Sequence, residues 1–192
     1  KLRADGTVAI YQPLYSKQGC FGSEITFSDE ADSDLTGMDS LWIRPQLTGA
    51  SAYEDGWPAG VRVDAVGTHF SAHANYGAPR TLDFGQGADD AVSGNASLHF
   101  QDGLLASPLS FALSLHPTTG VVTETPDSSD YSLGLTKSNG TFAGNILHSD
   151  GTTLIYRGII LNKGSNQGGF GYFMSSGAGG QSGGVTLDPA GP

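Results

Sequence analysis

Two stretches of this chain match without a gap: Gly19-Cys-Phe-Gly-Ser-Glu-Ile-Thr-Phe-Ser-Asp29 and, 121 residues later, Gly140-Thr-Phe-Ala-Gly-Asn-Ile-Leu-His-Ser-Asp150. Five positions are identical in the two stretches: Gly19/Gly140, Phe21/Phe142, Ile25/Ile146, Ser28/Ser149 and Asp29/Asp150. The same offset places Leu35-Thr-Gly37 over Tyr156-Arg-Gly158. A repeat at a fixed offset predicts a fold built from two related halves, at roughly residues 7–60 and 130–187. We interpret the recurring residues as turn and core positions.

Outward from these stretches, short apolar runs alternate with clusters of Gly, Asn, Asp, Ser and Pro, and Gly accounts for 29 of the 192 residues. This texture is typical of many short strands joined by turns. We expect twelve strands, at Val8–Leu14, Phe21–Phe27, Leu41–Ile43, Val61–Val66, Ser97–Phe100, Leu109–Leu115, Val121–Thr125, Tyr131–Leu135, Phe142–Leu147, Thr153–Leu161, Gly169–Met174 and Gly183–Leu187. The prediction is an all-β fold in one domain, residues 1–192, forming an antiparallel β-barrel or a barrel-like sandwich.

Turn chemistry and side-chain alternation add local detail. Asn139-Gly140 and Asp150-Gly151 are the residue pairs that tight hairpins favour. The segment Leu109–Leu115 alternates between apolar and small polar residues, as a half-buried strand does. The segment Tyr156–Leu161 is apolar at nearly every position, which favours a strand covered on both faces.

The acidic composition excludes some classes of function. The formal net charge is −10, the pI is about 4.6, and the nine basic residues form no cluster. Binding to nucleic acid needs a concentrated positive surface, so we expect no nucleic-acid partner. No apolar run approaches the roughly 20 residues of a membrane-spanning helix, so we expect no membrane insertion.

No catalytic constellation is evident in the sequence. No nucleophile elbow, phosphate-binding loop or selectable pair of carboxylates occurs in a suitable strand and turn context. We therefore expect no catalytic residues and no enzyme, with glycan hydrolysis as a minor alternative.

An acidic turn follows the first repeat stretch and carries Asp29, Glu30, Asp32, Asp34 and Asp39. Calcium binds to six to eight oxygens, and the Asp-x-Asp pair Asp32 and Asp34 is a plausible start for such a site. Charge runs of this kind are more often solvated turns. We expect no cofactor, with calcium at Asp32 and Asp34 as the alternative.

The connection at residues 44–86 carries weak alternation outside Val61–Val66 and is rich in aromatic residues. Long loops on β scaffolds often hold the recognition surface. Tyr53, Trp57 and Tyr76 are the candidate binding residues, because exposed rings stack on sugars or on partner proteins. Trp42, inside the apolar run Leu41–Ile43, is assigned to the core.

A family resemblance rests on glycine and aromatic patterns spread over most of the chain. They are Ala4-Asp-Gly6, Pro13-Leu-Tyr15, Leu41-Trp-Ile-Arg-Pro45, Ala65-Val-Gly67, Gly140-x-Phe-x-Gly144, Ile159 to Lys163, and Gly169-Phe-Gly-Tyr-Phe173 closing on Gly184-Val-x-Leu187. The chain resembles β-rich modules found toward the C-termini of large secreted or cell-surface proteins of Verrucomicrobia-like bacteria. The resemblance implies an extracellular or cell-surface location in a bacterium and no established activity.

These observations predict a non-enzymatic extracellular module for assembly or adhesion at the bacterial cell surface. The alternatives are a carbohydrate-binding module, which would use the aromatics of the 44–86 connection, and a small-ligand-binding barrel. The abrupt start at Lys1 is expected of a fragment or processed product of a larger protein. Thr7–Leu14 would then be an edge strand for pairing with a partner protein or with another copy.

Overall fold

The computed structural model describes residues 1–70, 94–115, 122–124 and 129–189. By its backbone contacts the chain divides into two compact units, which we describe separately. Unit 1 contains Lys1–His69 and Lys163–Ser165, and unit 2 contains Phe70–Asn162 and Asn166–Pro192. The single domain expected from the sequence stays a prediction.

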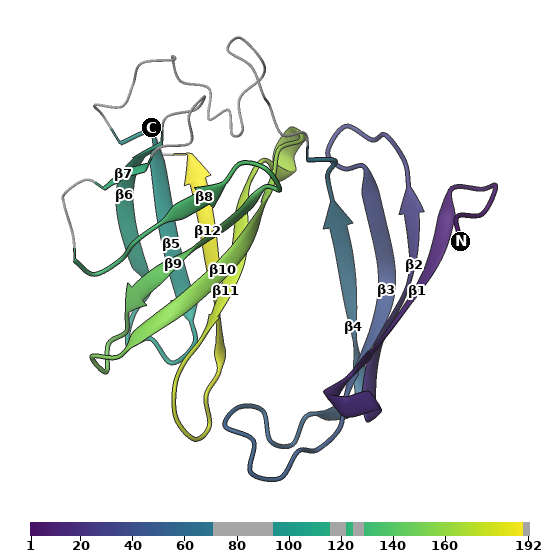
Figure 1. Cartoon of the computed structure of the whole chain (residues 1–192), viewed down its shortest axis with the longest axis horizontal. Coiled ribbons are helices and arrows are strands. Elements are labelled where there is room, and N and C mark those ends of the chain that lie inside the picture. Colours follow the sequence, from purple (N-terminus) through teal and green to yellow (C-terminus); the bar gives the residue numbers. More distant parts are fainter. Residues whose placement is uncertain (71–93, 116–121, 125–128, 190–192) are drawn as a thin grey trace. The chain divides into compact units, whose positions relative to one another are not determined.

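Each of the twelve expected strands corresponds to one strand of the structure (Figure 1). They are β1 (Thr7–Leu14), β2 (Gly19–Phe27), β3 (Leu35–Arg44), β4 (Trp57–Gly67), β5 (Ala96–Asp102), β6 (Leu109–Leu115), β7 (Val122–Glu124), β8 (Gly134–Thr136), β9 (Thr141–Leu147), β10 (Thr153–Leu161), β11 (Gly168–Met174) and β12 (Ser182–Pro189). Two short 3-10 turns, η1 (Tyr15–Lys17) and η2 (Gly164–Asn166), complete the elements.

The strands form two antiparallel sheets, and the all-β, barrel-like fold is confirmed. Unit 1 holds a four-stranded sheet in the order β1-β2-β3-β4. Unit 2 holds an eight-stranded sheet in the order β7-β6-β5-β12-β11-β10-β9-β8. Both repeat halves are therefore up-and-down meanders, and β5 to β7 extend the second one beyond β12.

The two halves differ in their strand register. In unit 1 Thr26 pairs with Thr36, whereas Leu147, the counterpart of Thr26, pairs with Thr153. The counterpart of Thr153 is Asp32, which lies in the turn between β2 and β3. The repeat thus conserves strands and their order while the intervening hairpin turn differs in length.

The hydrophobic core lies in unit 2. Its members are the buried side chains of Ala96, Leu98, Phe100, Leu113, Leu115, Tyr131, Phe142, Ile146, Leu154, Tyr156, Ile160, Phe173, Val185 and Leu187. The ring of Phe100 packs edge-on against those of Tyr156 and Phe173, at centroid distances of 5.1 and 6.1 Å. The expected inward face of β6 is confirmed, because Leu113 and Leu115 belong to this core.

Strand glycines make room for the core rings. A Cβ atom at Gly158 would collide with the ring of Phe142, and one at Gly183 would collide with the ring of Phe173. The rings therefore lie across bare backbone, which is one reason for glycine in a strand interior. The hairpin glycines Gly140 and Gly151 have φ values of +66° and +83°, as their tight turns require.

Unit 1 is different, because Ile25 is its one buried hydrophobic side chain among the residues described. Beside Ile25 the sheet contains a polar contact, in which the hydroxyls of Ser23 and Ser40 lie 2.7 Å apart. Most other apolar side chains of β1 to β4 are half-buried or exposed. Strand pairing is consequently the main source of order in this sheet.

Strand β1 lies at the edge of the four-stranded sheet, as the sequence indicated. The Gly6 carbonyl accepts a hydrogen bond from the Phe27 N–H (3.0 Å), so the even-numbered residues that follow bond to β2. The backbone groups that face away from β2 are those of Thr7, Ala9, Tyr11 and Pro13.

Candidate functional site

The most distinctive surface of unit 2 is the outer face of β10 and β11. Side chains alternate across the sheet, so Tyr156, Ile160 and Phe173 enter the core while their neighbours point outward. We call the outward set the β10–β11 face: Thr153, Ile155, Arg157, Ile159, Phe170, Tyr172 and Met174.

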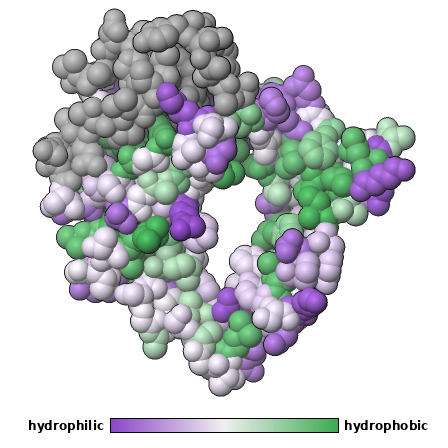
Figure 2. Space-filling model, viewed as in Figure 1, coloured by the Kyte–Doolittle hydropathy of each residue, from purple (hydrophilic) through white to green (hydrophobic). Residues whose placement is uncertain are grey.

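This face is strongly apolar and open to solvent. The exposed fractions are 62% for Ile155, 50% for Ile159, 40% for Phe170 and 59% for Tyr172. Hydrophobic residues also lie among polar ones elsewhere on the surfaces of both units (Figure 2). On β10 and β11 they are contiguous, because Ile159 pairs directly with Phe170 across the strands.

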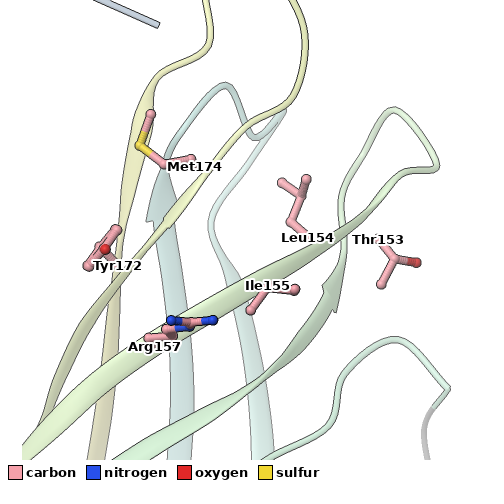
Figure 3. Close-up of a pocket in the computed structure, with 6 residues that line it drawn as sticks. All are labelled: Thr153, Leu154, Ile155, Arg157, Tyr172 and Met174. Carbon is pink, nitrogen blue, oxygen red and sulfur yellow. The ribbon is translucent and has the colours of Figure 1, made fainter. Parts of the chain in front are cut away.

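Two shallow hollows, of about 390 and 300 Å³, lie side by side on the β10–β11 face. Arg157 and Tyr172 line both hollows, and they are directly paired across the two strands. In the first hollow, Ile155 and Arg157 extend from β10 beside Tyr172 and Met174 on β11 (Figure 3). Arg157 and Tyr172 thus form a ridge between two apolar depressions.

Arg157 is exposed, and no hydrogen bond or ion pair joins its guanidinium to another residue that the structure describes. The other described arginines all have acceptors. Arg3 pairs with Glu24 at 2.5 Å, Arg44 donates to the carbonyls of Tyr53 and Ala52, and Arg62 donates to the carbonyl of Asp39. Among the arginines that the structure describes, Arg157 is therefore the one whose five N–H donors remain available to a binding partner.

The sequence did not single out this face. Tyr156–Leu161 was expected to be covered on both sides, and this expectation was wrong, because Ile159 is half exposed and Arg157 is exposed. The outward positions of β10 hold Ile155 and Ile159 with Arg157 between them, so apolar and polar residues do not alternate along this strand. The signal that could have identified it is Arg157 itself, a charge that a strand covered on both faces would not hold unpaired.

Two of the three aromatic residues predicted as a binding site, Tyr53 and Trp57, belong to a packed cluster in unit 1. Trp57 begins β4, is half-buried, and meets Trp42 edge-on with ring centroids 4.7 Å apart. Tyr53 meets Trp57 edge-on at 5.8 Å, and Trp42 donates its indole N–H to the hydroxyl of Tyr15 (3.1 Å). The Arg44 guanidinium lies 5.0 Å from the centroid of the Tyr15 ring.

This packing changes the interpretation of two tryptophans. Trp57 was expected to project from a loop, but its ring is engaged by Trp42 and Tyr53, and its Nε1 is buried with no hydrogen-bond partner among the described residues. Trp42 belongs to the same cluster rather than to the main core. Tyr53 is 37% exposed. Tyr76 lies outside the described residues.

The acidic turn between β2 and β3 binds a lysine of its own chain. The Lys163 ammonium lies 2.5 Å from carboxylate oxygens of both Asp29 and Asp34. Asp32 accepts a hydrogen bond from the backbone N–H of Ser165 (2.6 Å). These contacts hold the short Lys163–Ser165 segment against the rest of unit 1. Lys163 supplies the positive charge beside Asp34.

The same contacts shift the ionisation of the groups involved. The Lys163 hydrogen bond, and then the backbone N–H of His69, hold the pKa of Asp34 below its usual value. The hydrogen bonds that the Lys163 ammonium donates to the carboxylates of Asp29 and Asp34 raise the pKa of Lys163. No group of three or more His, Cys, Asp or Glu side chains in the described ranges is arranged to hold a metal ion. Calcium at Asp32 and Asp34 stays a prediction.

A second ionisable pair lies in the hairpin turn of β9 and β10. The ring of His148 is buried, with its Nε2 3.2 Å from the Gly103 carbonyl and its Nδ1 3.0 Å from the Asp150 carboxylate. Hydrogen bonds from the hydroxyl and backbone of Thr152, with a smaller contribution from His148, lower the pKa of Asp150 to about 2. The bonds of Asp150 are internal to the turn, and His148 joins the turn to the backbone after β5, so we assign the pair a structural role.

Comparison with known proteins returned no match to a family model, to a curated protein or to a solved structure. The family resemblance drawn from the sequence therefore stays a prediction. Within the described residues, no helix is long and apolar enough to cross a membrane.

Proposed function

We propose that this chain is a non-enzymatic extracellular module that supports assembly or adhesion at a bacterial cell surface, through the β10–β11 face. The observation that carries the proposal is the contiguous exposure of Ile155, Ile159, Phe170 and Tyr172 on one sheet surface. Contiguous apolar patches on a protein surface are typical of interaction sites, because covering them removes apolar area from water.

The other candidate surfaces have weaker support. The rings of Trp42, Trp57 and Tyr53 pack edge-on against one another, so each is already engaged within the chain. The interior of unit 2 around Phe100 is filled by edge-to-face rings, as in a packed core rather than a ligand-binding barrel. Edge strand β1 offers few backbone groups, because those of Thr7 are already bonded and Pro13 has no N–H.

Binding of the fluorescently labelled chain to intact bacterial cells tests the proposal. We expect Ile159→Thr combined with Tyr172→Thr to reduce cell association, because both substitutions remove exposed apolar area while threonine keeps a high strand propensity. Leu147→Thr is the matched control, since Leu147 is 42% exposed on β9 but lines neither hollow.

Three results would contradict the proposal. They are unchanged cell association of the double variant, an equal loss in the Leu147→Thr control, and turnover of a glycan substrate by the wild-type chain. A glycan array probed with wild type and Trp57→Ala separates the carbohydrate alternative, which requires a signal that depends on Trp57.

A further inference from the structure

Resting on the proposed function of the β10–β11 face, we infer that its partner is an extended protein segment with a carboxylate flanked by apolar side chains. Arg157 is the recognition residue. The proposal joins three observations: an exposed arginine without an acceptor among the described residues, apolar residues on both sides of it, and two hollows that share it.

The chemistry of Arg157 sets the charge of the partner. A guanidinium presents a planar fork of donors that matches a carboxylate in two parallel hydrogen bonds. The chain as a whole carries a net charge of −10, yet the lining of both hollows contains a single charged residue, which is positive. An acidic group on the partner is therefore complementary to this site although the rest of the protein repels it.

The spacing along β10 sets the shape of the partner. Ile155, Arg157 and Ile159 are alternate residues of one strand, so their side chains lie roughly 7 Å apart on one face. An extended segment with the pattern apolar-x-acidic-x-apolar has the same spacing. Its carboxylate then lies over Arg157 while its two apolar side chains enter the hollows on either side.

The lining favours a protein over a glycan. Apart from Arg157, the polar side-chain groups of the two hollows are the hydroxyls of Thr153 and Tyr172. Each sugar unit carries several hydroxyls that need hydrogen-bond partners once they leave water. Ile155, Ile159 and Phe170 cannot supply them, whereas they pack well against Ile, Val or Leu of a peptide.

The test uses three blocked peptides and the whole chain. Thr-Ile-Thr-Glu-Thr-Ile-Thr has the inferred pattern, and two further peptides replace its Glu with Gln or with Lys. Affinities are measured by titration with NMR detection of the β10 and β11 amides. We expect the wild-type chain to bind the Glu peptide about fivefold more tightly than the Gln peptide and to bind the Lys peptide most weakly.

Charge exchange makes the test specific for Arg157. Arg157→Glu should reverse the order, so that the Lys peptide binds more tightly than the Glu peptide. Tyr172→Ala should weaken the Glu and Gln peptides by a similar factor, because it removes the contact with the uncharged ring and leaves Arg157 in place. Both side chains are exposed, and near-UV circular dichroism checks that the variants remain folded.

The possible failures are distinguishable. Binding that depends on Tyr172 but is the same for all three peptides overturns the inference and leaves the proposed function standing. If no peptide binds and the Ile159→Thr, Tyr172→Thr double variant also keeps its association with cells, both are overturned. A polyuronate oligosaccharide is a further probe. If it binds through Arg157 and none of the peptides binds, the inference is overturned in favour of an acidic glycan.

Discussion

The ring of Tyr131 stacks on the ring of Phe111, with centroids 4.4 Å apart and planes 29° apart. Phe111 belongs to β6, near one end of the eight-stranded sheet, and Tyr131 forms a bridge to Ile146 beside β8, at the other end. The contact therefore joins the two ends of the sheet and curls it over the core of unit 2.

We predict that Tyr131→Ala lowers the free energy of unfolding of unit 2 by about 3 kcal/mol or more, because it removes a buried ring at this closure. Tyr131→Phe keeps the ring and loses the hydrogen bond to the Ala112 carbonyl, and should cost about 1 kcal/mol. Urea denaturation measures both. Equal losses in the two variants would show that the hydroxyl, rather than the stacking, closes the sheet.

We predict that Gly158→Ala destabilises the chain by about 1–3 kcal/mol, because the new methyl group would collide with the Phe142 ring and force it to move. Gly184→Ala on β12 is the matched control, since its Cβ would meet only the side chain of Gln101, at 3.5 Å. The control should be neutral or slightly stabilising. Thermal unfolding of both variants distinguishes these outcomes, and equal melting temperatures would contradict the prediction.

We predict an acid-dependent contribution to stability from Asp150. Its pKa in the folded chain, about 2, lies below the ordinary 3.8, mainly because the Thr152 hydroxyl and N–H bond to the ionised carboxylate. The carboxylate therefore stabilises the folded chain above pH 3.8, and this contribution disappears as the pH falls from 3.8 towards 2. Asp150→Asn should be less stable than wild type at pH 7, with a difference that shrinks over this interval. A difference that is constant with pH would exclude the mechanism.

We predict that Lys163→Gln raises the pKa of Asp34 towards its ordinary value, because the largest cause of its lowering is the Lys163 hydrogen bond. The backbone N–H of His69 remains bonded to Asp34 and should keep part of the lowering. NMR titration of the Asp34 carboxyl measures the change. Lys137→Gln serves as the control, since Lys137 is exposed on the β8–β9 turn, and it should leave Asp34 unaffected.

The positions of the strands along the chain were predictable, because strands and tight turns have local sequence patterns. Gly140 and Gly151 mark hairpins through their turn chemistry, and Leu109–Leu115 matches the observed β6 residue for residue. β3 was predicted too short, since it begins at Leu35 and contains Gly37 and Asp39, which favour turns. Asp39 has a φ of +57° at an irregularity between Gly37 and Ser40, so pairing with β2 and β4 overrides local preference there.

The candidate site was less predictable, because exposure is a property of the folded sheet. Trp57 and Ile159 illustrate the difference. A tryptophan between Gly56 and Pro58 has the sequence context of an exposed loop ring, but Trp42 lies beside it in the folded sheet and covers it. Ile159 has the context of a buried strand, but the core of unit 2 lies on the other side of β10. Neither fact is encoded in the neighbouring residues.

The exposed edge of β1 is shorter than the strand itself. The N–H of Thr7 donates a hydrogen bond to the Asp5 carboxylate (3.0 Å), and its carbonyl accepts one from the Arg3 N–H (2.8 Å). Pro13 has no N–H to donate. Ala9 and Tyr11 alone keep both outward backbone groups for another strand. Two residues offer little to a strand from another copy, so the β1 edge of this sheet is protected against edge-to-edge aggregation.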